Sequence, residues 1–148
     1  MTRTQPLDIE LLHEVFKEAR RLGVRVWRLM RHAPHVIELL FPAAQYPGLS
    51  VHDRAIAVEK LTRDAVDSIG GDAGHALAIT LCLLPGTLGQ TLDERRRLAA
   101  AHLGILQDTW ERGWREDRLF HDLVMEIYRL HRTNPDPAAY FPAIGPSG

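Results

Sequence analysis

Cationic side chains near the N-terminus are the first candidates for binding chemistry. At 100° per residue, a helix over residues 17–32 brings its basic side chains within one arc of about 140°. These side chains are Lys17, Arg20, Arg21, Arg25, Arg28, Arg31 and His32. Arginines that lie one turn apart can follow a phosphate backbone. The candidate nucleic-acid contacts on this helix are therefore Arg21, Arg25, Arg28 and Arg31.

Three interpretations fit this basic face. It can be a solvated surface that a neighbouring subunit's acidic last third neutralises, a contact to nucleic-acid phosphates, or a site for an acidic protein or a membrane surface. Arg25, Arg28 and Arg31 lack acidic partners at helical spacing, so they are available for any of these roles. The bulky apolar residues on the opposite side are explained more simply by packing within the domain than by insertion into lipid.

A second candidate site lies in the sequence LAAAHLGILQDTWERGWRE, residues 98–116. Small residues at 99 and 100, a glycine at 104 and flanking apolar residues are what two helices crossing at a sharp angle need. This pattern resembles bacterial helix-turn-helix domains, particularly an actinobacterial style of module with the pattern RR…AA…LG…TW-R. The resemblance covers residues 92–118. It implies DNA contacts from Gln107, Arg112 and Arg115.

The same segment departs from that pattern in its capping residue and its charge. Leu106 stands where a Ser or Thr usually caps the second helix, so capping passes to Asp108, with Glu111 three residues later. Residues 108–122 carry three arginines against five acids. A segment of negative charge approaches phosphates poorly. The bent geometry can therefore serve instead a protein-binding adaptor or effector-associated module that makes no DNA contact.

Signatures of catalysis and metal binding are missing from the sequence. It has no H-E-x-x-H, no cysteine pair, no P-loop and no G-x-S-x-G. His32 and His35 are two ligands without a nearby thiol or carboxylate, which makes a poor metal site. Cys82 is the only cysteine and lies in the apolar run ALAITLCLL, which indicates a packed thiol. We expect a protein that is not an enzyme and uses no cofactor and no metal.

The elements that must position these residues are helical. Periodicity of 3.6 runs through nearly the whole chain, and no segment alternates with the period of two that marks a strand. Capping pairs predict where helices begin: Ser50 with Asp53, and Thr91 with Glu94. We expect an all-α fold, a compact bundle of about six or seven helices that contains the helix-turn-helix-like unit. The expected helices are residues 8–32, 34–41, 51–69, 72–84, 92–103, 108–115 and 117–132.

Length and composition fit one ordinary domain. The 148 residues carry 18 basic side chains against 19 acidic ones. The net charge of -1 provides no global attraction to nucleic acid, so any such contact needs a local patch. We expect residues 1–133 to form a single all-α domain and the proline-rich residues 134–148 to form a flexible tail. The alternative for the tail is that Tyr140 and Phe141 fold back on the core.

Location and partners follow from the apolar content. The N-terminal sequence MTRTQPLD lacks the apolar stretch of an export signal, and no run approaches the roughly 20 apolar residues of a membrane span. We therefore expect a cytoplasmic protein without a membrane partner. The leading expectation is a non-enzymatic, helix-turn-helix-like regulator that binds double-stranded DNA, with a possible homodimer because paired half-sites supply specificity. The alternative is an adaptor that binds an acidic protein partner.

Overall fold

The chain folds into helices packed around one central helix. The computed structural model describes residues 7–87, 89–104 and 114–142. Within these ranges the regular structure consists of seven α-helices and one 3-10 helix, with no strand, which confirms the all-α class. The elements are α1 (Ile9–Ala19), α2 (Val26–His32), α3 (Pro34–Leu40), α4 (Val51–Ile69), α5 (Gly71–Thr80), α6 (Leu92–His102), α8 (Trp114–Thr133) and η1 (Pro137–Tyr140).

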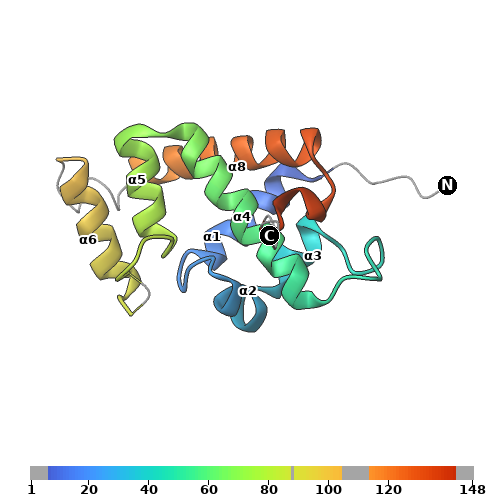
Figure 1. Ribbon diagram of the computed structural model, residues 1–148. Coiled ribbons are helices and arrows are strands. Elements are labelled where there is room, and N and C mark those ends of the chain that lie inside the picture. Colours follow the sequence, from blue (N-terminus) through green and yellow to red (C-terminus); the bar gives the residue numbers. More distant parts are fainter. Residues whose placement is uncertain (1–6, 88, 105–113, 143–148) are drawn as a thin grey trace, which may run out of the picture.

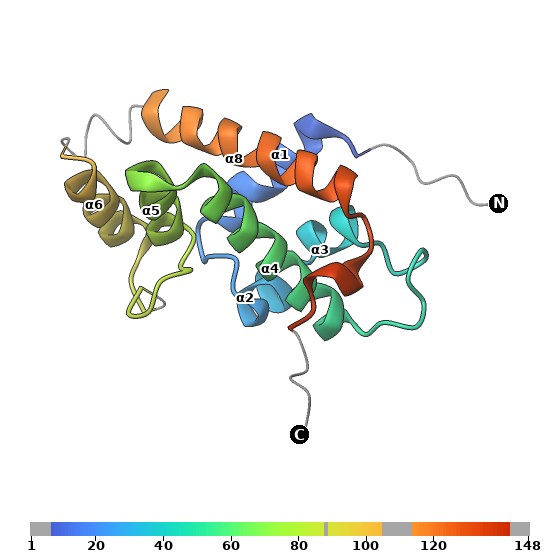
Figure 2. The ribbon, with the colours of Figure 1, turned by 45° about the horizontal axis from the view of Figure 1, so that its top comes forward.

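Helix α4 lies at the centre and contacts α2, α3, α5, α8 and η1. Helix α8 runs along one side of α4 and also packs against α1, while α6 lies at one end of the molecule next to α5 (Figures 1 and 2). The largest apolar side chains that are fully buried in the core are Leu12, Phe16, Leu29, Ile37, Leu40, Phe41, Leu61, Leu77, Leu81 and Phe120. A smaller apolar cluster of Ala76, Ile79, Ala99 and Ala100 joins α5 to α6.

The ends of α4 are determined by local chemistry. Ser50 Oγ accepts a hydrogen bond from the Asp53 amide at 3.0 Å, and Asp53 Oδ2 accepts one from the Ser50 amide at 3.3 Å. This reciprocal pair satisfies two amides that the first turn leaves unpaired. At the other end, Gly70 has φ +65°. The predicted capping box is confirmed.

The first helix is not continuous, and the prediction of one helix over residues 8–32 is wrong. Helix α1 ends at Ala19, and α2 begins at Val26. Between them Gly23 has φ +92°, which interrupts the helix. The turn is fixed by the core, because the Val24 amide donates to the Leu81 carbonyl at 3.0 Å and the Val24 side chain is fully buried. The arginines of residues 20–31 therefore do not share one helical face.

Two other helix boundaries differ from the prediction. Helix α5 ends at Thr80, four residues before the predicted end, because Cys82 adopts φ +62° and turns the chain. The side chain of Cys82 is buried, as predicted. Helix α8 runs through residues 115–117 without the predicted break. Glu116 and Asp117 lie in its first turn, where acidic side chains interact favourably with the helix dipole.

The C-terminal segment is partly docked on the core. Residues Pro137–Tyr140 form the 3-10 helix η1, and the Tyr140 side chain is only 3% exposed. The Tyr140 hydroxyl lies 2.9 Å from the Asn134 carbonyl and 3.2 Å from the Leu130 carbonyl, and its burial raises the pKa of Tyr140 to about 12. The expectation of a flexible tail is therefore corrected for this segment, which follows the fold-back alternative. Residues 143–148 lie outside the described ranges.

His131 links the stability of this packing to pH. Its Nε2 lies 2.7 Å from the Leu40 carbonyl, and its ring centroid lies 5.4 Å from that of Phe41. Burial lowers the pKa of His131 below 6.5, although the hydrogen bond to Leu40 acts in the opposite direction. The unfolded chain then binds the proton more readily than the folded one. The free energy of unfolding is therefore expected to fall as the pH drops below about 6.5, down to the folded-state pKa.

Urea unfolding at several pH values tests this prediction. His131→Gln removes the titration and keeps a side-chain N–H for the Leu40 carbonyl, so its stability is expected to decline less between about pH 7 and pH 5 than that of the wild type. His121→Gln, at an exposed position of α8, is the matched control and is expected to follow the wild type. Parallel pH dependences for the wild type and His131→Gln would contradict the assignment.

Candidate anion-binding site

The predicted contact residues are divided among three places. Arg21 and Arg25 lie in the turn between α1 and α2, and Arg28 and Arg31 lie on α2. Arg21 and Arg31 are exposed, and neither side chain has an ion-pair partner within the part of the chain that the structure describes. Gln107 and Arg112 lie outside the described residues. The backbone of Arg115 belongs to α8, but its side chain lies outside the description as well.

Arg25 is a structural residue. Its Nε lies 3.1 Å from Glu59 Oε1 on α4, and the same carboxylate accepts a hydrogen bond from the Val26 amide at 3.2 Å. Glu59 thus binds an amide at the first turn of α2 together with the preceding arginine. Arg25 has no acidic partner at helical spacing, but Glu59 of another helix pairs with it, so the expectation that Arg25 is available for binding is wrong. Because its guanidinium pairs with Glu59, Arg25 is a weaker candidate for a phosphate contact.

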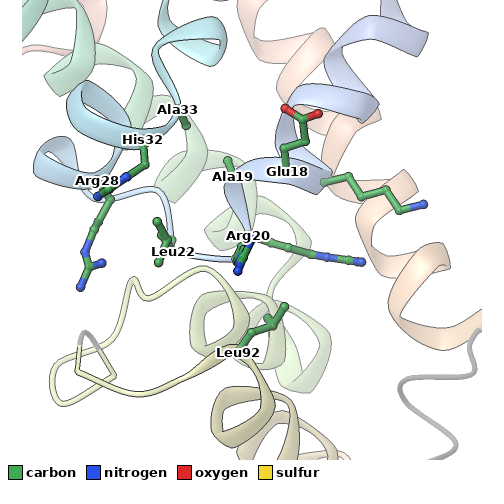
Figure 3. A pocket seen from close by; sticks show the side chains of 11 residues that line it. Glu18, Ala19, Arg20, Leu22, Arg28, His32, Ala33 and Leu92 are labelled. Atoms are coloured by element: carbon green, nitrogen blue, oxygen red, sulfur yellow. The ribbon is translucent and has the colours of Figure 1, made fainter.

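A cationic hollow lies between the C-terminal end of α1, helix α2 and the start of α6. Its volume is about 700 Å³. Figure 3 shows Arg20 and Leu22 from the end of α1 and the turn after it, Arg28 and His32 from α2, and Leu92 from α6 around this space. The basic residues that line it are Lys17, Arg20, Arg21, Arg28 and His32. Among its described lining residues, Glu18 is the one acid.

A buried arginine supports the wall of this hollow. The Arg95 side chain of α6 is 1% exposed and donates to the carbonyls of Arg20 at 2.9 Å and Arg21 at 2.6 Å, and also to the carbonyl of Thr80. These carbonyls lie at the C-terminal ends of α1 and α5, where the helix leaves them without intrahelical partners. Burial lowers the pKa of Arg95. Arg95 thus fixes the backbone whose side chains line the hollow.

This role of Arg95 was not predicted from the sequence, in which residues 95 and 96 were assigned only to the helix-turn-helix-like motif. One signal was present in the sequence. Arg95 lies three residues after Leu92 and four before Ala99, so the three share one face of a helix. Ala99 is buried against α5, which places Arg95 toward the interior rather than toward solvent. Its bonding to carbonyls of distant segments had no sequence signal.

A buried ionic cluster joins the C-terminal end of α1 to α6 and α8. Glu116 is 2% exposed, and its carboxylate lies 3.1 Å from Arg20 Nη1 and 3.0 Å from Arg96 Nε. Burial raises the pKa of Glu116, and the two guanidinium groups oppose that shift. The Arg20 guanidinium also lies 5.4 Å from the centroid of the Phe120 ring. Arg20 is therefore committed to an internal contact, although its residue lines the hollow.

Not all of the basic residues that line the hollow face the solvent. Lys17, Arg21 and His32 are exposed, whereas Arg28 is half-buried and takes part in an interaction within the protein. Lys17 and Arg21 have no ion-pair partner within the described ranges. A concave surface with such groups raises the local concentration of anions and can donate charge-assisted hydrogen bonds to phosphate or carboxylate oxygens.

The structure describes only the first half of the predicted turn after α6, up to Gly104. Gly104 has φ +69°, the left-handed conformation expected at the corner, and Ala99 and Ala100 are buried. The second helix of the unit is expected over residues 108–115, of which 108–113 lie outside the described ranges, while Trp114 and Arg115 belong to α8. Of the arginines in the motif, Arg95 and Arg96 are engaged in internal contacts. The candidate site for an anion is therefore the hollow rather than α6.

Comparisons with known proteins add no relationship to this site. No family model matches the chain, and neither the curated proteins nor the solved structures include a significant match. Among the described residues, no helix combines the length and the apolar character needed to cross a membrane. Within those same ranges, no group of three or more His, Cys, Asp and Glu side chains is arranged to hold a metal ion.

Proposed function

We propose that the protein is a non-enzymatic regulatory domain that binds double-stranded DNA and contacts the phosphate backbone through the cationic hollow. The observation that carries the proposal is the exposure of Lys17 and Arg21 at a hollow whose described lining contains a single acid. Phosphate contacts supply much of the affinity for DNA and fix the register of the protein on the duplex. Arg31, exposed on α2, extends the cationic surface.

Sequence-specific contacts are assigned in this proposal to the helix-turn-helix-like unit. Gln107, Arg112 and Arg115 are the candidates that its resemblance to bacterial domains supplies. The hollow then serves the part of recognition that carries no sequence information, since phosphate contacts position a protein and base contacts specify the site. Because the net charge of the chain is -1, the local hollow must supply the attraction.

A mobility-shift experiment tests the DNA contact. The wild type is expected to retard random duplex DNA at about 50 mM salt and to lose the complex as salt rises. Lys17→Glu with Arg21→Glu is expected to raise the dissociation constant about a hundredfold and to make the salt slope shallower by about 2. Lys60→Glu with Arg132→Glu is the matched control, because it changes the net charge equally at exposed positions of α4 and α8.

The control is expected to change the dissociation constant far less than the hollow variant. Lys60 is exposed and pairs with Asp64, and a surface ion pair of this kind contributes roughly 0.2–1 kcal/mol to stability. Equal losses for both double variants would show that net charge, not the hollow, governs the affinity. Absence of any shift for the wild type at low salt would overturn the DNA-binding proposal.

One observation favours the alternative, an adaptor that binds an acidic protein. Trp27 on α2 is 70% exposed, which is unusual for so large an apolar side chain. It is adjacent in sequence to Arg28, which lines the hollow. Tryptophan is enriched among the residues that dominate protein interfaces, where truncation costs about 2 kcal/mol or more.

One substitution, tested with two ligands, distinguishes the two proposed functions. An adaptor is expected to bind a poly-glutamate peptide in fluorescence anisotropy without retarding duplex DNA, and Trp27→Ala is expected to weaken that binding about thirtyfold. The DNA-binding proposal instead predicts that Trp27→Ala retains the mobility shift. A shift that disappears in Trp27→Ala while the helical circular dichroism is unchanged would count against the hollow as the main contact.

A further inference from the structure

Three hollows adjoin one another along the exposed side of α1. The first lies at the start of α1, the second lies between α1 and α3, and the third is the cationic hollow. The first two share Leu11 and Glu14, and the second and third share Glu18. They therefore form one continuous surface, which we call the α1 face.

The charge of the α1 face changes sign from one end to the other. Its acidic end is lined by Asp8, Glu10 and Glu14, and its basic end contains Lys17 and Arg21. All five of these side chains are exposed. Along α1 the sign changes between Glu14 and Lys17, and Glu18 is an acid that lies on the basic side of this change. Glu38 of the second hollow is paired with Arg54. One face of the molecule thus carries separated opposite charges.

We propose that this face binds a second copy of the chain in a two-fold symmetric dimer. In an isologous contact the same patch meets itself, so the acidic end of each protomer lies opposite the basic end of the other. An axis that passes between Glu14 and Lys17 brings both pairs of opposite charges together at once, with Glu10 opposite Arg21 and Glu14 opposite Lys17 of the other copy. Charge complementarity between the two ends therefore identifies the occupant as another copy rather than as a wholly basic or wholly acidic partner.

Apolar side chains give the contact a surface to bury. Leu11 is 47% exposed within the acidic end, and Leu39 of α3 is partly exposed beside it in the second hollow. An exposed leucine that lines a charged hollow gains from being covered by an opposing protomer. The contact is nevertheless mostly electrostatic, so we expect self-association to weaken as salt rises.

If the protein binds DNA as proposed, the dimer affects that binding. Only this effect rests on the proposed function. The acidic end of one protomer occupies the cationic hollow of the other, which is where the proposed DNA contact lies. Dimerisation and DNA binding then compete, so DNA is expected to dissociate the dimer. The dimer itself depends only on the charge arrangement of the α1 face.

Sedimentation velocity on two opposite charge variants tests the proposal. The wild type is expected to self-associate at about 50 mM salt, with a dissociation constant at least about tenfold higher at 300 mM. Glu10→Lys with Glu14→Lys makes both ends basic, and Lys17→Glu with Arg21→Glu makes both ends acidic. Each variant alone is expected to be monomeric. An equimolar mixture of the two is expected to restore a dimer, because each contact again joins opposite charges.

The mixture keeps the test decisive, since misfolded variants would not restore association with each other. Asp67→Lys with Asp122→Lys is the matched control, at exposed acids of α4 and α8 that do not line these hollows, and it is expected to dimerise like the wild type. A monomeric wild type at low salt, or a mixture that remains monomeric, would overturn the proposal.

The DNA experiment separates failure of the dimer from failure of the proposed function. Glu10→Lys with Glu14→Lys retains the cationic hollow and is expected to bind duplex DNA at least as tightly as the wild type while being monomeric. Tight DNA binding with a monomeric wild type would refute the dimer alone. A salt-sensitive dimer without any mobility shift would refute DNA binding alone.

Discussion

Replacing Arg95 with methionine is expected to lower the free energy of unfolding by about 3–5 kcal/mol. The guanidinium is buried and donates to the carbonyls of Arg20, Arg21 and Thr80. Methionine fills much of the same volume but offers no donor. The substitution therefore removes the hydrogen-bond donor of three carbonyls at the ends of α1 and α5. Each buried carbonyl that is left without a donor costs about 1–3 kcal/mol.

Urea unfolding followed by circular dichroism measures this loss. Arg97→Met is the matched control two residues away on α6, where the arginine side chain is 67% exposed and its ion pair with Asp93 is at the surface. The control is expected to change stability by about 0.5 kcal/mol or less. Amide exchange should also show weaker protection in α6 of the Arg95 variant, because Arg95 joins that helix to the turn after α1.

A loss below about 1 kcal/mol in Arg95→Met would contradict the structural role of this side chain. It would mean that the carbonyls find other donors or water when the guanidinium is removed. The lining of the cationic hollow would then be set by the turn itself rather than by its bonding to α6. Lys17 and Arg21 would still be exposed, so the DNA experiment would remain interpretable.

Replacing Gly23 with alanine is expected to destabilise the protein by about 3 kcal/mol or more, from two separate causes. The glycine has φ +92°, a backbone angle that residues other than glycine rarely adopt. An added Cβ would lie 2.6 Å from Cys82 Cβ and 2.9 Å from the Leu81 carbonyl oxygen. The second of these neighbours is backbone, so it cannot rotate away as a flexible side chain can.

Alanine substitutions at two other glycines distinguish the cost of backbone strain from the cost of crowding around an added Cβ. Gly86 has φ +84° with no atom within 4 Å of an added Cβ, so Gly86→Ala carries strain alone, about 1–2 kcal/mol. Gly48 has neither feature, and Gly48→Ala is expected to stay within about 0.5 kcal/mol of the wild type. Thermal or urea unfolding of the three variants measures the series. A Gly23→Ala variant no worse than Gly86→Ala would show that the approach to Cys82 relaxes at little cost.

The sequence by itself was sufficient for features that depend on neighbouring residues. The capping box of Ser50 with Asp53 and the positive φ of Gly104 could be predicted, because each depends on residues within one turn of each other. The helical class followed from periodicity in the same way. The buried position of Cys82 followed from its apolar run.

The tertiary structure alone decided which arginines are available for binding. Arg25 pairs with Glu59, Arg20 and Arg96 share Glu116, and Arg95 bonds to carbonyls of two other segments, all across long stretches of sequence. Arg21 lies one residue from Arg20 and yet is exposed.

The break of the first helix has the same origin. A helical pattern continues through residues 20–25, but the burial of Val24 and its hydrogen bond to Leu81 hold Gly23 in a left-handed turn. Spacing along one helix predicts which side chains share a face, whereas burial and ion pairing depend on which other helices pack against that face. For that reason the basic residues could be recognised from the sequence, but the hollow that gathers Lys17, Arg21, Arg28 and His32 could not.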